Sequence, residues 1–357
     1  MEANLRPGLS STDRATDWEI TMKAIVQNAY GSPEDVLELQ DIEKPVAKED
    51  EVLVRVHAAS VHPDVWHVVT GLPYVLHIMG AGLLRPKIKV PGTDVAGHVE
   101  SIGKNVTRFR PGDEVFGESV RGIQWHNGGA YAEYVSVREK SLALKPANLT
   151  FEQAAAVPTS GFIAIQAIHG RGRLQPGQRV LINGAGGAVG AFAVQLAKAY
   201  RADVTGVDST AKLEMVRSLG ADRVIDYTKE DFTRRGEHYD LILDVPGIHR
   251  SSDIRRALTP TGTYVLIGHD RFGASGRRWI GGIGQFLKLL VLSPFVSQRM
   301  APRESKEIKD PLGLLKELVE AGKITPVIDR TFPLSEVREA IRYLAEGHAR
   351  GRIIITM

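Results

Sequence analysis

Residues 178–190 read QRVLINGAGGAVG, and the fold class follows from this stretch. It begins with the short apolar run 179–182, whose composition is typical of a β-strand. Glycines then recur in the spacing Gly184-x-x-Gly187-x-x-Gly190, and the following AFAVQLAKAYRA has the apolar face of a helix. The order strand, glycine turn, helix predicts one unit of an α/β domain with a parallel sheet.

The glycine turn has the features of a diphosphate-binding site. The N-terminus of a helix offers unpaired N–H groups and the positive end of the helix dipole, which together attract a phosphate. Side chains would hold the phosphates away from the backbone, so glycine is required where they approach. Asp208 ends the next apolar run, ADVTGVD, and an acid at that place accepts hydrogen bonds from an adenosine ribose. These features predict that the chain binds a dinucleotide.

The composition is ordinary for a globular protein, with 43% hydrophobic and 24% charged residues among 357, enough for two domains or one large domain. The net charge of +3 is too small to imply nucleic acid or an acidic membrane as a partner. The absence of cysteine excludes disulfides, cysteine-ligated zinc, iron–sulfur clusters and thiol catalysis. No apolar run reaches the roughly 20 residues needed to span a bilayer. We expect a cytoplasmic protein.

The chain divides by pattern into a β unit and an α/β unit. Residues 1–21 are polar and lack periodicity, and we expect a disordered extension there. Short β-rich runs then continue to residue 146, which predicts an all-β unit. Strands alternate with helices over 179–268, which predicts a parallel sheet covered on both faces. Two amphipathic helices and the strand RIIITM end the chain, and we expect this strand to return to the β unit.

The sequence resembles the medium-chain dehydrogenases/reductases, specifically the zinc-free quinone-oxidoreductase branch. The resemblance is carried in order by AASVHPDVWHVVTG, VPGTDVAGHVESIGKNVTRFRPGDEVFG, GAYAEYV, AAAVPTSGFIAIQAI, GQRVLINGAGGAVG, SLGADRVIDYTKEDF and GHARGRIII. It implies an α/β fold made of a GroES-like β-barrel domain, residues 22–150 and 305–357, and a Rossmann domain, residues 151–304. The active site would lie in the cleft between the two domains.

The resemblance also implies that no catalytic zinc is bound. The zinc-dependent branch uses a Cys, a His and a second Cys, and the corresponding places here are His62, Thr93 and a small residue near Ala156. Thr and Ala cannot replace the lost ligands. The run His62-x-Asp64-x-x-His67 offers three ligand types, but a spacing of five residues does not place both histidines on one helix face. We expect these two histidines to line the pocket wall or to lie on the surface, without binding a metal ion.

Without a metal, the protein must polarise its substrate by hydrogen bonds while the coenzyme carries the hydride. That chemistry suits quinones and α,β-unsaturated carbonyls better than simple alcohols. His62 and His67 are candidate proton donors, because imidazole titrates near neutrality, although pocket lining is the alternative. Relatives usually carry Asn where His62 stands. Thr159 stands where the resemblance implies a hydroxyl near the nicotinamide, and a helix cap is its alternative reading.

The choice of coenzyme, NADH or NADPH, is contested within the sequence. Asp208 would repel a 2′-phosphate and favours NADH. Lys212 and Tyr227 match positions that hold this phosphate in NADPH-dependent relatives. On the strength of Asp208 we lean slightly to NADH, while Lys212 and Tyr227 keep NADPH open. The predicted coenzyme-binding residues are Thr159, Gly184, Gly187, Ala188, Val189, Gly190, Asp208, Ser209, Lys212, Tyr227, Gly247, Gly268 and His269.

Three further expectations concern substrate and assembly. Trp66, Tyr74 and Phe295 are candidates for stacking on a flat substrate, or else core or interface residues. The apolar segment 277–300 is expected to cover the substrate cleft or a subunit interface. Relatives commonly dimerise through the edge of the last Rossmann strand, which we assign to GTYVLIG, so we expect a homodimer. Two other functions stay open: metal-free alcohol or carbonyl oxidoreduction, and NAD(P)H binding with a structural or sensing role.

Overall fold

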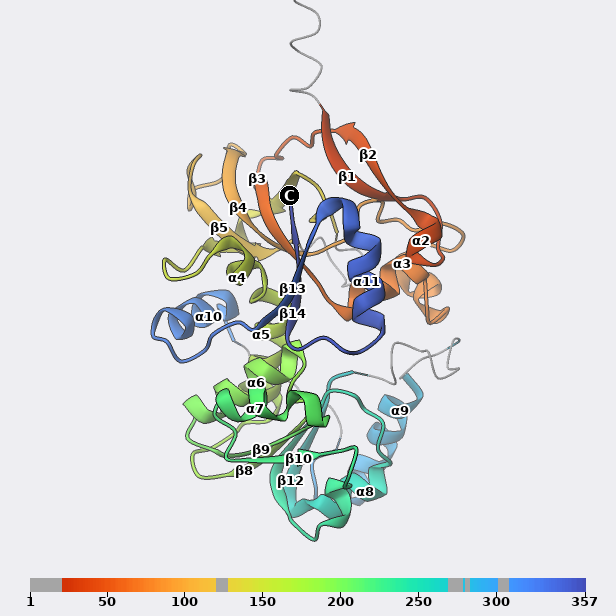
Figure 1. The fold of residues 1–357 in the computed structure, drawn as a ribbon, viewed down its shortest axis with the longest axis vertical. Helices are drawn as coiled ribbons and strands as arrows, with labels where there is room; N and C mark the ends of the chain where they lie inside the picture. Colours follow the sequence, from red (N-terminus) through yellow and green to blue (C-terminus); the bar gives the residue numbers. More distant parts are fainter. Residues whose placement is uncertain (1–20, 120–127, 269–278, 280–282, 301–307) are drawn as a thin grey trace, which may run out of the picture.

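The computed structural model describes residues 21–119, 128–268, 279, 283–300 and 308–357. Of the predicted disordered extension, only Thr21 belongs to the described residues. The chain forms an upper half rich in β-strands and a lower α/β half, with helix α5 (Pro158–Ile165) at their junction (Figure 1). Both halves contribute to one buried cluster, in which Ala96 and Phe116 of the upper half share a core with Val180 of the lower half.

The upper half is built on two sheets. Strand β1 (Thr21–Gln27) pairs antiparallel with β2 (Leu37–Glu43). The larger sheet contains β3 (Glu51–Val61), β4 (Asp94–Ile102), β5 (Glu114–Glu118), β6 (Tyr134–Arg138), β7 (Leu142–Leu144), β13 (Ile328–Pro333) and β14 (Arg352–Thr356). Its order is β13-β14-β3-β4-β5-β7, and β6 also pairs with β3. Because β14 pairs antiparallel with β3, the end of the chain returns to the β unit, as predicted.

The helices of the upper half have clear start and stop signals. Helix α3 (Pro63–Thr70) begins after the N-cap His62 with proline at its first position, and it ends at Gly71 in the left-handed conformation. Helix α11 (Val337–Ala345) buries Val337, Ala340 and Ile341 in the core that includes the larger sheet. The short helices α2 (Pro33–Val36) and α4 (Phe151–Ala155) complete this half.

The lower half is the predicted parallel sheet with helices on both faces. Its strands are β8 (Arg179–Asn183), β9 (Asp203–Asp208), β10 (Arg223–Asp226), β11 (Tyr239–Asp244) and β12 (Leu258–Leu266), in the order β10-β9-β8-β11-β12. This order reverses direction beside β8, as in doubly wound sheets. Alternate residues of β8 enter different cores: Val180 and Ile182 one, Leu181 the other. The helices of this half and its linkers are α6 (Ala188–Ala199), α7 (Leu213–Ser218), α8 (Ser251–Ala257), α9 (Ile283–Leu292) and α10 (Pro311–Glu320).

The outer edge of β12 differs from the expectation. The N–H of Tyr264 donates to the carbonyl of Arg299 at 2.9 Å, and the N–H of Arg299 donates to the carbonyl of Gly262 at 2.9 Å. Arg299 therefore forms a single β-bridge to the first residues of GTYVLIG, at the edge that we had assigned to a partner subunit. Sequence pattern missed this contact because the polar residues around Arg299 give no strand signal.

Candidate active site

The glycine turn joins the end of β8 to the start of α6. Gly184 has a φ of +83°, which favours glycine. A Cβ placed on Gly190 would lie 2.1 Å from the carbonyl oxygen of Gly184, so helix and turn approach too closely for any side chain. Gly187 is the N-cap of α6, and no side chain caps this helix end. The first N–H groups of α6 are thus left for another acceptor.

The turn fits the diphosphate of a dinucleotide. A Cβ on Gly187 would meet nothing nearer than the Gly184 carbonyl oxygen at 3.5 Å, so open space lies beside the helix N-terminus. Ala188, Val189 and Gly190 form the first turn of α6, where N–H groups and the helix dipole favour a phosphate. The predicted coenzyme residues of this stretch are therefore brought together at one helix end.

Asp208 holds the glycine turn in place. It ends β9, is buried, and accepts hydrogen bonds from the N–H of Gly186 at 2.7 Å and the N–H of Ser209 at 2.8 Å. Each carboxylate oxygen has a second lone pair, so a ribose hydroxyl can still donate to it. Asp208 thus shapes the turn and keeps lone pairs that could accept from a further donor.

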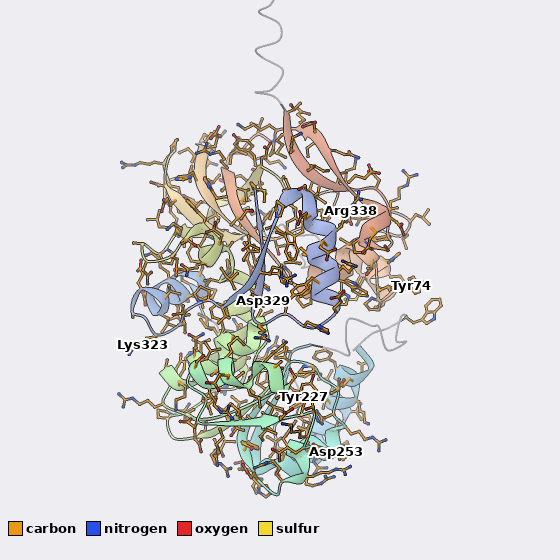
Figure 2. The ribbon with its side chains drawn as sticks, in the orientation of Figure 1. Tyr74, Tyr227, Asp253, Lys323, Asp329 and Arg338 are labelled. Atoms are coloured by element: carbon orange, nitrogen blue, oxygen red, sulfur yellow. The ribbon has the colours of Figure 1, made fainter. Side chains whose placement is uncertain are left out.

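Lys212 is tied to the end of the chain. Its Nζ donates to the carbonyl of Ala349 at 2.6 Å and lies 3.5 Å from that of Gly347. The N–H of Gly351 donates to the carbonyl of Gly186, so the glycine turn itself contacts the segment that leads into β14. Tyr227 follows β10 and is 58% exposed; Figure 2 labels it in the lower half. Sequence pattern did not reveal that Lys212 serves as a link between the two halves.

The other predicted coenzyme residues lie at the same edge of the parallel sheet. Gly247 follows β11 and donates its N–H to Asp244 Oδ1 at 3.1 Å, while Gly268 follows β12 and donates to the carbonyl of Val245. Asp244 is buried, and it also accepts from the hydroxyl of Tyr264 at 2.9 Å. Burial and the charge of Asp244 raise the pKa of Tyr264. His269 lies outside the described residues.

A second group of polar residues, which we name the acid cluster, lies where the two halves meet. It consists of Ser60, Asp94, Glu118, Thr159 and Arg352. Asp94 is fully buried and accepts four hydrogen bonds. The donors are Ser60 Oγ at 2.6 Å, the Thr159 N–H at 3.2 Å, Thr159 Oγ1 at 2.5 Å and the Arg352 guanidinium at 2.5 Å.

Glu118 is the second carboxyl group of the acid cluster. It stands directly opposite Asp94 in the antiparallel pairing of β4 and β5, so both side chains lie on one face of the sheet. Burial raises the pKa of Glu118 to about 7, and repulsion from Asp94 adds to the rise. Hydrogen bonding with Thr159 and the charges of His62 and Arg352 act in the opposite direction.

The two candidate histidines have different surroundings. His62 lies beside the acid cluster, and its Nε2 is 2.6 Å from Thr93 Oγ1. Its Nδ1 lies 3.3 Å from the backbone nitrogen of Asp64 and 3.4 Å from the Asp64 carboxylate Oδ2. His67 is buried, its Nδ1 lies 2.5 Å from the carbonyl of Leu72, and its ring packs against Trp66. Of the two, only His62 is grouped with Thr159.

The expected aromatic residues do not gather at the acid cluster. Tyr74 is 41% exposed, points outward in Figure 2, and packs its ring 5.3 Å from that of Trp279. Phe295 is 81% exposed. In the segment 277–300, Leu289 and Met300 are buried against the parallel sheet, while the carbonyl of Trp279 accepts from the N–H of Val75. This segment thus contacts both halves of the molecule.

Of the five residues of the acid cluster, only Thr159 was among the predicted site residues; Ser60 and three charged residues were missed. Asp94 and Arg352 lie inside GTDVAG and GHARGRIII, two stretches that carry the family resemblance, and Glu118 directly follows PGDEVFG. A charged residue within an otherwise apolar strand was the available signal. Sequence pattern could not show that these three segments meet.

Comparison with known proteins agrees with this geometry. Residues 48–147 match the family model described as alcohol dehydrogenase GroES-like domain, and residues 219–355 match the one described as zinc-binding dehydrogenase. The mitochondrial NAD(P)H oxidoreductase RTN4IP1 of Mus musculus is 36% identical over 98% of this chain and 92% of its own length. The chloroplastic NADPH-dependent alkenal/one oxidoreductase of Arabidopsis thaliana is 35% identical over 94% of this chain and 79% of its own.

Solved structures show the same architecture. The quinone oxidoreductase of Coxiella burnetii superposes with a TM-score of 0.79 at 29% identity, covering 94% of this chain and 99% of its own. This likeness and the two family models confirm the predicted pairing of a GroES-like domain with a Rossmann sheet. Among the described residues, no helix combines the length and apolar character needed to cross a bilayer.

The residues present do not fit the zinc that one family description mentions. The chain has no cysteine, and Thr93 is hydrogen-bonded to His62. Within the described part of the chain, no three His, Asp or Glu side chains are grouped so that they could hold a metal ion. The donor set therefore offers at most one imidazole where a tetrahedral site would need several ligands.

Proposed function

Because this chain belongs to the medium-chain dehydrogenases/reductases, in the quinone-oxidoreductase-like branch, we propose that it is an NAD(P)H-dependent reductase of quinones or α,β-unsaturated carbonyls that works without zinc. The observation that carries the proposal is the contact between the glycine turn and the segment leading into the acid cluster. The Gly351 N–H bonds to Gly186, and the next residue, Arg352, bonds to Asp94. Two neighbouring residues, Gly351 and Arg352, therefore connect the glycine turn to the acid cluster.

The residues of the chain have separate tasks in this proposal. A bound coenzyme supplies the hydride. The glycine turn and the first turn of α6 hold its diphosphate, and Asp208 receives its ribose. Thr159 would line the nicotinamide end of the site, with its hydroxyl fixed by the hydrogen bond to Asp94. His62 and Thr93 form a polar pair that can donate a hydrogen bond to a substrate oxygen as negative charge develops there.

The proposal extends to the domain division and to the assembly. We assign residues 22–150 and 305–357 to the GroES-like domain, supported by the pairing of β14 with β3. We assign 151–304 to the Rossmann domain, supported by the five-stranded parallel sheet. A homodimer stays part of the proposal, but residues 262–264 of β12 already bond to Arg299 and do not offer a free edge. A cytoplasmic location also stays a prediction.

The test of the proposed function is to follow NADH and NADPH absorbance with a panel of quinones, enones and aldehydes. We expect turnover with quinones or enones, unchanged after treatment with a zinc chelator. Turnover with aldehydes or alcohols alone would favour the metal-free alcohol and carbonyl reading. Tight coenzyme binding without turnover of any acceptor would contradict catalysis and favour a binding role.

For the coenzyme, we keep the slight lean to NADH. Asp208 would face a 2′-phosphate as a buried acid, and Lys212 is bonded to two backbone carbonyls instead of being offered to a phosphate. Comparison of kcat/KM for NADH and NADPH in the wild type and in Asp208→Ala decides the matter. We expect the variant to shift toward NADPH. A large NADPH preference in the wild type would contradict the lean.

A further inference from the structure

Exposed apolar side chains are concentrated on one side of the molecule. Of the seventeen large apolar or aromatic side chains that are exposed in the described part of the chain, ten belong to residues 74–84 and 279–295. These two segments touch, because the N–H of Val75 donates to the carbonyl of Trp279 at 3.0 Å and the rings of Tyr74 and Trp279 pack together. Figure 1 shows α3, which leads into the first segment, and α9, within the second, on the same side. We name the ten side chains the apolar surface: Tyr74, Ile78, Met79, Leu83, Leu84, Trp279, Leu287, Leu290, Val291 and Phe295.

Helix α9 is apolar on the face that it exposes as well as on the face that it buries. Leu289 belongs to a core of the parallel sheet, and Phe286 packs against that core. Leu287, Leu290 and Val291 have the spacing i, i+3, i+4 of one helix face, and all three are exposed. A helix that faces water ordinarily turns charged and polar residues outward. The outward face of α9 is therefore suited to an apolar environment.

The leucines of the first segment are held outward by a fixed backbone. The hydroxyl of Tyr30 donates to the carbonyl of Gly82 at 3.0 Å. The ring Nδ1 of His77 lies 2.9 Å from the carbonyl oxygen of Leu83. Leu84 follows directly and is 92% exposed. Because side-chain contacts from outside the leucine pair fix the backbone here, the exposure of both leucines is a feature of the fold.

Positive charge borders the apolar surface. Four exposed basic residues lie in or directly after its segments: Arg85, Lys87, Lys89 and Lys288. Residues 71–93 contain no Asp or Glu, and neither do residues 283–300. The net charge of +3 gave no sign of this concentration, because it averages the whole chain. An apolar surface bordered by cations is suited to a partner that is apolar and negatively charged.

We propose that the apolar surface docks on a lipid bilayer that contains anionic lipids, so that the protein binds membranes peripherally. The projecting leucine, tryptophan and phenylalanine side chains enter the boundary between headgroups and acyl chains, as the apolar face of an interfacial helix does. The basic residues bind the anionic headgroups. This inference goes beyond the proposed reductase function and does not depend on it.

A second copy of the chain is the competing occupant, and the charges argue against it. A two-fold symmetric contact brings the same surface of both copies together. The four basic residues would then face their own equivalents at the edge of an apolar contact, where like charges are strongly unfavourable. Anionic headgroups neutralise the same residues, which is why the observations favour a bilayer.

The first experiment measures binding of the full chain to sedimenting vesicles, without coenzyme or substrate. We expect the wild type to pellet with phosphatidylcholine vesicles that contain about 30% phosphatidylserine, in about 0.1 M NaCl. Vesicles of phosphatidylcholine alone should bind it about tenfold more weakly, and about 0.5 M NaCl should release most of the protein from the anionic vesicles. A wild type that does not pellet with the anionic vesicles would overturn the proposal.

Matched variants test the apolar side chains. Leu83→Ser combined with Leu84→Ser should weaken vesicle binding by about tenfold or more, because two apolar side chains no longer enter the bilayer. Val46→Ser changes a similarly exposed residue between β2 and β3 and should bind as the wild type does. All three residues are exposed, so the melting temperatures should stay unchanged. Equal vesicle binding by the leucine variant and the Val46→Ser control would overturn the proposal.

The basic residues are tested in the same way. Lys87→Gln combined with Lys89→Gln should weaken binding to the anionic vesicles by about tenfold. Lys309→Gln combined with Lys323→Gln removes the same charge from exposed positions elsewhere and should have little effect. Figure 2 shows Lys323 and Tyr74 on opposite sides of the molecule. Equal losses in the two double variants would show attraction by net charge alone and would overturn the assignment to this surface.

Sedimentation velocity distinguishes the second copy from the bilayer. We expect the wild type and the variant Leu287→Ser with Leu290→Ser to have the same oligomeric state, and the variant to bind vesicles about tenfold more weakly. A wild-type dimer that separates into monomers in this variant, together with no vesicle binding by the wild type, would assign the apolar surface to a subunit interface and overturn the proposal.

Discussion

The glycine turn and the acid cluster are in direct contact through Gly351 and Arg352, yet they are built in different ways. The turn is made of backbone atoms from one short stretch, residues 184–190, with Asp208 as its outside support. The acid cluster is made of side chains from β3, β4, β5, α5 and β14. The turn therefore requires residues that have no Cβ atom, whereas the acid cluster requires charged side chains that are paired with one another.

This difference predicts different responses to mutation. A backbone site fails when bulk is added, because no rotamer relieves a clash with a carbonyl oxygen. A side-chain site fails when one partner is removed, because the other is left buried and unsatisfied. The following experiments compare the two sites, beginning with the largest expected effect.

Within the glycine turn, Gly190→Ala and Gly187→Ala should separate folding from binding. The new Cβ at Gly190 would lie 2.1 Å from the Gly184 carbonyl oxygen, whereas that at Gly187 would lie 3.5 Å from it. We expect Gly190→Ala to destabilise the protein by roughly 4 kcal/mol or more and to abolish coenzyme binding. Gly187→Ala should keep its melting temperature and lose affinity, because its methyl group occupies the diphosphate space. Thermal melts and coenzyme titration measure both; full coenzyme affinity in Gly187→Ala would contradict the assigned diphosphate site.

In the acid cluster, Arg352→Met should be strongly destabilising without any clash. It leaves Asp94, which is fully buried, without its guanidinium partner. We expect a loss of about 3–5 kcal/mol in the free energy of unfolding, measured with urea. Arg350→Met, an exposed neighbour, is the matched control and should change stability by about 0.5 kcal/mol or less. Equal losses in the two variants would show that the pairing with Asp94 is unimportant.

The smallest of these effects is the pH dependence that Glu118 gives to stability. Its folded pKa of about 7 lies above the ordinary value of 4.5, so the folded state holds the proton longer than the unfolded state. Stability should therefore fall as pH rises between these two values, by at most about 3 kcal/mol in total. Glu118→Gln lacks this titration, so its stability relative to wild type should increase from pH 4.5 to pH 8. If urea unfolding gives the same stability difference between Glu118→Gln and wild type at both pH values, the raised pKa of Glu118 is contradicted.

Much of the glycine turn and its surroundings could be predicted, because the signals for them are local in sequence. The run of β8, the glycine spacing and Asp208 at the end of β9 lie within thirty residues, and the structure brings them together at one helix end. Gly247 and Gly268 followed from the rule that strand ends line one edge of a parallel sheet. Lys212 shows the limit of such reasoning, because its partners Gly347 and Ala349 are distant in sequence.

The sequence by itself determined the parallel sheet, the glycine turn and the family, because periodicity and glycine spacing act over a few residues. Only the tertiary structure decided which polar residues meet in the acid cluster. Asp94 and Arg352 are separated by 258 positions, and their 2.5 Å contact exists because β14 returns to pair with β3. The physical reason is that a buried charge is stable only beside an opposite charge. Strand pairing decides which residue lies beside it, and the local sequence does not show which strands will pair.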